Sequence, residues 1–117
     1  MKKKSSLFWI LIPAFIVLGS GRAFASVPQT PAEHLALSQS YQEKADAQKQ
    51  LVEEHQKMKA EYKEMTTHGN PKFRNSPMLR KMYTHCDGII AKARALELEF
   101  EKFAEWHKMR AKELEGQ

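Results

Sequence analysis

The side chains best suited to chemistry in this sequence are histidines, methionines and a single cysteine, several of them spaced in multiples of seven. His34 and His55 are 21 residues apart, and so are Cys86 and His107. On a helix this spacing equals three heptads, so both members of each pair would lie on one seam. Imidazole binds zinc, copper and iron, whereas thiolate and thioether sulfur favour softer ions, above all Cu(I). The pattern therefore predicts ligands for a transition metal or for haem.

A reversal of the chain near Pro71 would gather these ligands into two layers. If two helices run back from that turn, facing residues have numbers that sum to about 142. The predicted ligands are then His55, Met58, Met82, His85 and Cys86 in a middle layer, and His34 and His107 in an outer layer. The middle layer would suit Cu or Zn, or haem b with a histidine on each side of the iron. Covalent c-type haem is excluded, because no C-x-x-C-H motif occurs.

The same residues also have an ordinary structural interpretation, which the sequence leaves open. Histidines on a partly apolar seam are often packed and hydrogen-bonded. Methionines at helical spacing commonly fill a core, and Cys86 could serve as a small buried hydrophobic residue. The stronger single-helix metal motif H-E-x-x-H is absent.

Asp87 and Gly88 directly follow the His85-Cys86 pair. A carboxylate beside a ligating histidine can orient its imidazole, so Asp87 is a candidate for that role. Glycine within a helix costs about 1 kcal/mol relative to alanine. Gly88 therefore predicts either a close approach by another group or a tolerated surface position.

Motifs for catalysis are missing from the sequence. We find no serine or cysteine nucleophile motif, no phosphate-binding glycine loop and no dinucleotide fingerprint. The glutamates at 97, 99, 101 and 105 form a solvated face that balances neighbouring lysine and arginine residues. We therefore expect that the protein is not an enzyme.

Two long helical segments must position these residues. Thr30-Pro31-Ala32-Glu33 combines a capping box with proline at the first helical position, and good helix formers continue to residue 66. Gly69 and Pro71 predict the stop, with Gly69 as a left-handed cap. Ser76-Pro77 repeats the start signal. The expected fold is all-α, a hairpin of two long antiparallel helices at 31–66 and 77–114, joined by a loop at 67–76.

The second helix carries more apolar surface than one facing helix can cover. A series of large apolar residues recurs every seven positions: Met82, Ile89, Leu96 and Phe103. Tyr83 and Ile90 flank it, and Leu98 and Trp106 lie farther round. Two hairpins packed as a four-helix bundle would cover this surface, so we expect a homodimer or another envelope protein as partner.

Residues 1–25 have the composition of a secretory signal peptide. Lys2 to Lys4 are followed by an apolar run at 7–19 and by the small-x-small sequence Ala23-Phe24-Ala25. The run is shorter than the ~20 residues that span a bilayer. We therefore expect cleavage before Ser26 and a periplasmic or secreted single domain at 26–117 without a transmembrane segment.

The charge of the chain lies mostly in that segment. Four of the 19 basic residues and none of the 14 acidic residues fall within positions 1–25, so residues 26–117 have a net charge of +1. No single-sign stripe remains, which argues against nucleic acid as a partner. One cysteine allows no internal disulfide.

Segments 32–58 and 85–109, with their A-E-H, E-H-x-x-M and H-C-D motifs, resemble a set of small, exported, uncharacterised bacterial helical-hairpin proteins. The resemblance implies a helical fold and an extracytoplasmic compartment. The expected architecture is also similar to that of dimeric periplasmic stress chaperones, although their repeated L-T-x-x-Q pattern is absent. The alternative to metal or haem binding is therefore a scaffold, a chaperone-like module or an accessory subunit of an envelope complex.

Overall fold

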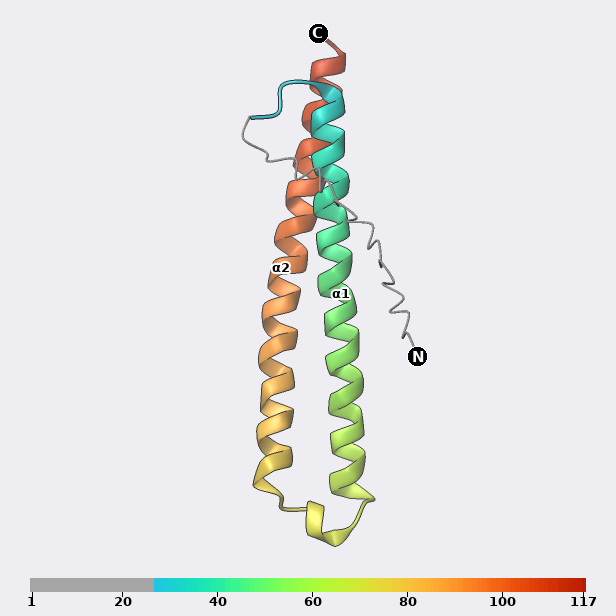
Figure 1. Ribbon diagram of the computed structural model, residues 1–117, viewed down its shortest axis with the longest axis vertical. Coiled ribbons are helices and arrows are strands. Elements are labelled where there is room, and N and C mark those ends of the chain that lie inside the picture. Colours follow the sequence, from blue (N-terminus) through green and yellow to red (C-terminus); the bar gives the residue numbers. More distant parts are fainter. Residues whose placement is uncertain (1–26) are drawn as a thin grey trace, which may run out of the picture.

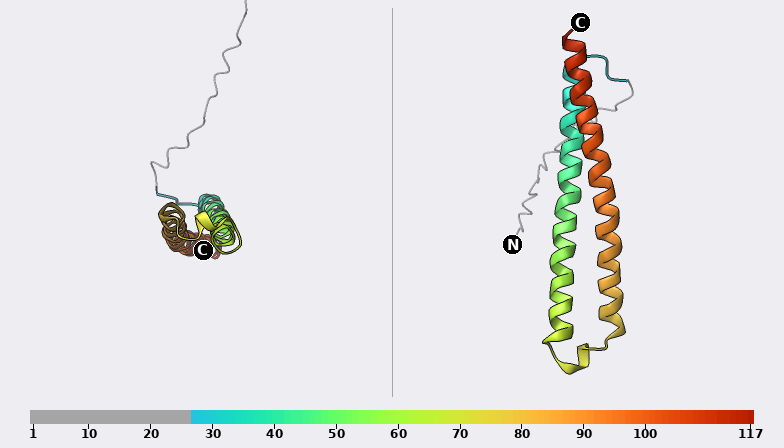
Figure 2. Two further views of the ribbon diagram at one scale, coloured as in Figure 1. Left: turned by 90° about the horizontal axis from the view of Figure 1, so that it is seen from below. Right: turned by 180° about the vertical axis from the view of Figure 1, so that it is seen from behind.

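Two long helices form nearly all of the computed structural model, which describes residues 27–117. Helix α1 spans Pro31–Thr67, the short 3-10 helix η1 spans Pro71–Phe73, and α2 spans Pro77–Glu115. In every view α1 and α2 lie side by side along their length, with η1 in the connection between them (Figures 1 and 2). The predicted all-α hairpin is confirmed. The expected signal peptide and the cleavage point before Ser26 lie outside the described residues.

The start of each helix is held by side-chain caps. The Thr30 hydroxyl accepts a hydrogen bond from the Glu33 N–H at 3.2 Å, and the Glu33 carboxylate accepts from the backbone N–H groups of Gln29 and Thr30 at 2.7 and 3.0 Å. The hydrogen bonds from Gln29 and then Thr30 lower the pKa of Glu33. At α2, the Ser76 hydroxyl accepts from the Leu79 N–H at 3.4 Å. These bonds satisfy N–H groups that have no partner within the helix.

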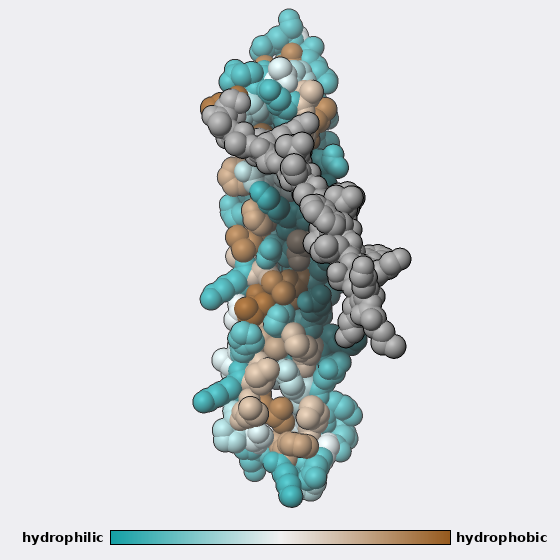
Figure 3. Space-filling model, viewed as in Figure 1, coloured by the Kyte–Doolittle hydropathy of each residue, from teal (hydrophilic) through white to brown (hydrophobic). Residues whose placement is uncertain are grey.

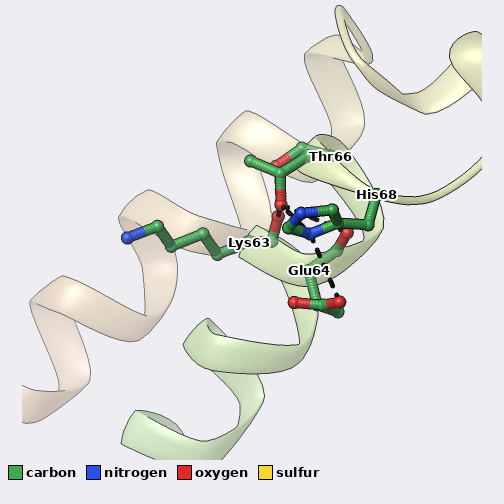
Figure 4. Close-up of polar contacts among 5 residues, drawn as sticks. Lys63, Glu64, Thr66 and His68 are labelled. Atoms are coloured by element: carbon green, nitrogen blue, oxygen red, sulfur yellow. Dashed lines mark hydrogen bonds and ion pairs between the residues drawn. The ribbon is translucent and has the colours of Figure 1, made fainter.

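The end of α1 differs from the predicted left-handed glycine cap. No residue in the described range has a positive φ, and the C-cap is His68, with φ −115° and ψ −8°. The His68 N–H donates to the Glu64 carbonyl at 2.9 Å. The Thr66 hydroxyl donates to the Lys63 carbonyl at 2.8 Å (Figure 4). The prediction was wrong because the chain leaves α1 in a right-handed conformation and reverses through η1.

Gly69 is nevertheless needed, for a reason other than handedness. A Cβ atom at this position would overlap the backbone carbonyl of Met65. The close approach of two backbone segments therefore selects glycine at this turn.

The interface between the helices is built from small side chains. Its buried apolar residues are Ala45, Val52, Leu79, Cys86, Ala93, Ala104 and Ala111. The Ser38 hydroxyl of α1 donates to the Ala104 carbonyl of α2 at 2.7 Å. Small residues allow this close approach of the helices, but they leave most large apolar side chains at the margins of the interface.

Neither helix within residues 27–117 is long and apolar enough to cross a bilayer.

Candidate functional site

The outer layer of predicted ligands forms a buried pair at the open end of the hairpin. His34 of α1 and His107 of α2 are 4% and 7% exposed, and their Nδ1 atoms lie 2.9 Å apart. Tyr41 stacks on the His107 ring, with centroids 5.6 Å apart and planes 9° apart, and Trp106 meets that ring edge-on at 4.8 Å. The predicted contact between His34 and His107 is confirmed.

This geometry makes the outer layer a hydrogen-bonded pair. One Nδ1 atom must carry a proton and donate the hydrogen bond, while the other Nδ1 accepts it through its lone pair. At least one Nδ1 atom is therefore unprotonated. Burial, and then the charge of His34, lowers the pKa of His107. Two Zn–N bonds at a tetrahedral angle would hold the nitrogens about 3.3 Å apart. In the observed arrangement the two nitrogens bind each other instead.

The middle layer brings His55 and His85 together. Their ring centroids are 6.0 Å apart and their planes meet at 65°. His55 is half-buried and His85 is exposed. The His55 Nδ1 atom is buried and has no hydrogen-bond partner within residues 27–117. A buried nitrogen without a partner is costly, so this atom is where a ligand would relieve a defect.

The other predicted ligands of this layer are less available. Cys86 is 1% exposed and packs within the interface as a free thiol. Met58 is half-buried and Met82 is 38% exposed. Within the described part of the chain, no group of three or more His, Cys, Asp or Glu residues is placed to hold a metal ion. His55 and His85 therefore form a two-ligand set.

The proposed orienting role of Asp87 does not fit its surroundings. Its carboxylate forms an ion pair with Lys59, whose Nζ also lies 4.4 Å from the centre of the Tyr83 ring. The hydrogen bond from Lys59 to Asp87 raises the lysine pKa. Together these three residues close one edge of the helix interface.

The opposite edge carries an apolar surface, which we call the open face. It comprises Leu37, Leu51, Met58 and Met65 from α1 and Met82, Ile89, Leu96 and Phe103 from α2. Each set follows a seven-residue repeat, with Lys44 at the position between Leu37 and Leu51, so its members lie along one side of their helix. Met65, Met82, Leu96 and Phe103 are 39, 38, 46 and 48% exposed. Hydrophobic surface follows the middle of the face seen in Figure 3, with polar residues along both margins.

No protein-family model, curated protein or solved structure matches this chain. The resemblance to exported helical-hairpin proteins therefore stays a prediction.

Several contacts around the two layers were not anticipated. The stacking of Tyr41 on His107 and the pairing of Lys59 with Asp87 both link the helices. Tyr41 follows His34 by one heptad, which would have indicated the first contact. Lys59 and Asp87 lie one helical turn out of the simple facing register, so periodicity alone did not pair them.

Proposed function

We propose that this chain is an exported, non-catalytic interaction module that works as a homodimer. Two hairpins would pack through the open face to form a four-helix bundle. The observation that carries this proposal is that small side chains fill the interface between α1 and α2, whereas large apolar side chains lie exposed at its margin. The largest fully buried side chain in the hairpin is Cys86, whereas Leu96 and Phe103 are each about half exposed.

The size of the open face supports a protein partner. If each large side chain has roughly 200 Å² of surface, the exposed parts of Met65, Met82, Leu96 and Phe103 together amount to several hundred Å². The largest apolar patch on a typical monomer covers about 300–600 Å² and is often functional. Stable interfaces bury about 800 Å² on each partner, including a polar rim. The open face with its charged margins fits that size.

The charges along the margins favour a second copy of the chain as the occupant. Two pairs of exposed residues near the same height on α1 and α2 carry opposite charges: Glu61 with Lys81, and Glu54 with Lys92. If the copies are related by a twofold axis along the hairpin, α1 of each faces α2 of the other at the same height. Opposite charges then meet at both margins, which favours this pairing over α1 against α1.

A hollow formed by the described residues is small for a ligand site. The hollow near the loop end of the hairpin has a volume of about 250 Å³ and is lined by residues that include Tyr62, Leu79 and Tyr83. Ligand pockets usually hold about 300–1,000 Å³ and contain convergent polar groups.

The second candidate function is metal binding. It is favoured by the His55 Nδ1 atom, which is buried and has no hydrogen-bond partner within residues 27–117.

The test compares two leucines on the same helix. Leu96 lies on the open face at 46% exposure, and Leu98 lies outside it at 57%. Leu96→Glu should convert the dimer to a monomer in sedimentation analysis, because it places a charge in the apolar interface. Leu98→Glu should stay dimeric. A wild-type protein that is monomeric from micromolar to millimolar concentration would overturn the proposal, as would equal effects of the two variants.

A charge swap tests the choice of orientation. Glu61→Lys should weaken the dimer, because two lysines then meet across the margin, and adding Lys81→Glu should restore it. If the double variant is no tighter than the single one, α1 does not face α2 of the second copy at this level.

A further inference from the structure

The imidazoles of His55 and His85 supply only part of the ligands that a metal ion needs, and they lie beside the open face. The Nδ1 atom of His55 is buried and has no hydrogen-bond partner in the described part of the chain, and the His85 ring lies 6.0 Å from the His55 ring, centroid to centroid. His85 is exposed, three residues beyond Met82 of the open face. Two imidazoles are half of the four ligands that zinc takes in structural sites. Within residues 27–117 no third His, Cys, Asp or Glu joins them.

We infer that a divalent transition-metal ion of the zinc type binds between two copies of the chain, held by His55 and His85 of both. This inference rests on the proposed homodimer. A twofold axis along the hairpin keeps every layer at its own height, so His55 of one copy lies level with His85 of the other. The two half-sites then meet in one layer and supply four nitrogen ligands.

The neighbouring residues fit a nitrogen-only site. Cys86 is 1% exposed, and its thiol lies inside the interface between α1 and α2, away from the open face. Met58 and Met82 lie on the open face within one helical turn of His55 and His85. Their apolar side chains would shield the ion from water, and such a shell controls solvent access to a metal. Imidazole ligands without thiolate suit zinc and Cu(II) better than Cu(I).

Zinc binding by the purified protein tests the site. Equilibrium dialysis against Zn²⁺ at neutral pH should give one ion for every two chains. His85→Ala should weaken binding by at least about 100-fold, because even outer-shell partners contribute 10–100-fold. His55→Gln should do the same and preserves the packed volume better than alanine. Cys86→Ser and His68→Ala are the matched controls and should bind zinc like the parent.

The possible outcomes separate the site from the dimer. A dimer that binds no zinc, or in which His85→Ala binds as tightly as the parent, overturns the metal site and leaves the proposed function intact. A chain that stays monomeric with and without zinc overturns the proposed function. One zinc ion bound per monomer overturns the shared metal site, because each copy would then hold its own ion, and leaves the proposed homodimer intact.

Discussion

His34 and His107 form a buried pair at the end of the hairpin remote from the loop, where Tyr41 stacks on the His107 ring and Trp106 meets both imidazoles edge-on. Burial lowers the pKa of His107 from its usual value of about 6.5. The unfolded chain therefore binds a proton at this residue more readily than the folded chain does. The resulting stabilisation is fully present above pH 6.5 and is lost as the pH falls below it.

We accordingly expect the melting temperature to fall as the pH is lowered from 7.5 to 5. His107→Gln, which cannot titrate, should flatten this decline, and circular dichroism melts at each pH would measure it. His68→Ala removes a histidine whose side chain is 76% exposed and should leave the slope unchanged. A decline as steep in His107→Gln as in the parent would show that another group controls the pH dependence.

At the scale of the elements, replacing Gly69 or Gly88 by alanine should have opposite effects on the stability of the hairpin. A Cβ atom at Gly88, within α2, meets nothing within 4 Å, whereas one at Gly69 would overlap the Met65 carbonyl. Gly88→Ala should therefore stabilise the hairpin by about 1 kcal/mol. Gly69→Ala should destabilise it by more than about 1 kcal/mol, because backbone must move.

Urea unfolding of both variants in the Leu96→Glu background would measure these effects without a contribution from the dimer interface. The two variants control for each other, because both substitutions add one methyl group and differ only in the space around it. If the two alanines shift the free energy of unfolding in the same direction, the local space around the glycines does not decide their effect.

At the scale of the whole molecule, the composition of residues 1–25 leads us to propose that they are removed on export. The protein isolated from the cell envelope should then begin at Ser26, and its intact mass would show this directly. It should also have a net charge near +1 instead of +5, because four basic residues leave with the segment. Recovery of a species that retains residues 1–25 would indicate an uncleaved anchor.

The amino-acid sequence by itself determined the two helices, because their signals are local. Thr30-Pro31 and Ser76-Pro77 set the starts, and the good helix formers that follow sustain the helices. The turn near Pro71 set the register in which His34 faces His107. Each of these signals acts within a few residues or repeats regularly along one helix, so no tertiary information is needed to interpret it.

Only the tertiary structure decided which partner each side chain contacts across the interface between α1 and α2. It paired Asp87 with Lys59 instead of a histidine, and it left the His55 Nδ1 atom without a hydrogen-bond partner among residues 27–117. It also made glycine necessary at position 69, because a Cβ atom there would overlap the Met65 carbonyl. Facing positions on two helices leave each side chain several neighbours within one turn. The choice among them depends on the separation and rotation of the helices, which small residues such as Ala45 and Ala104 set by allowing close contact.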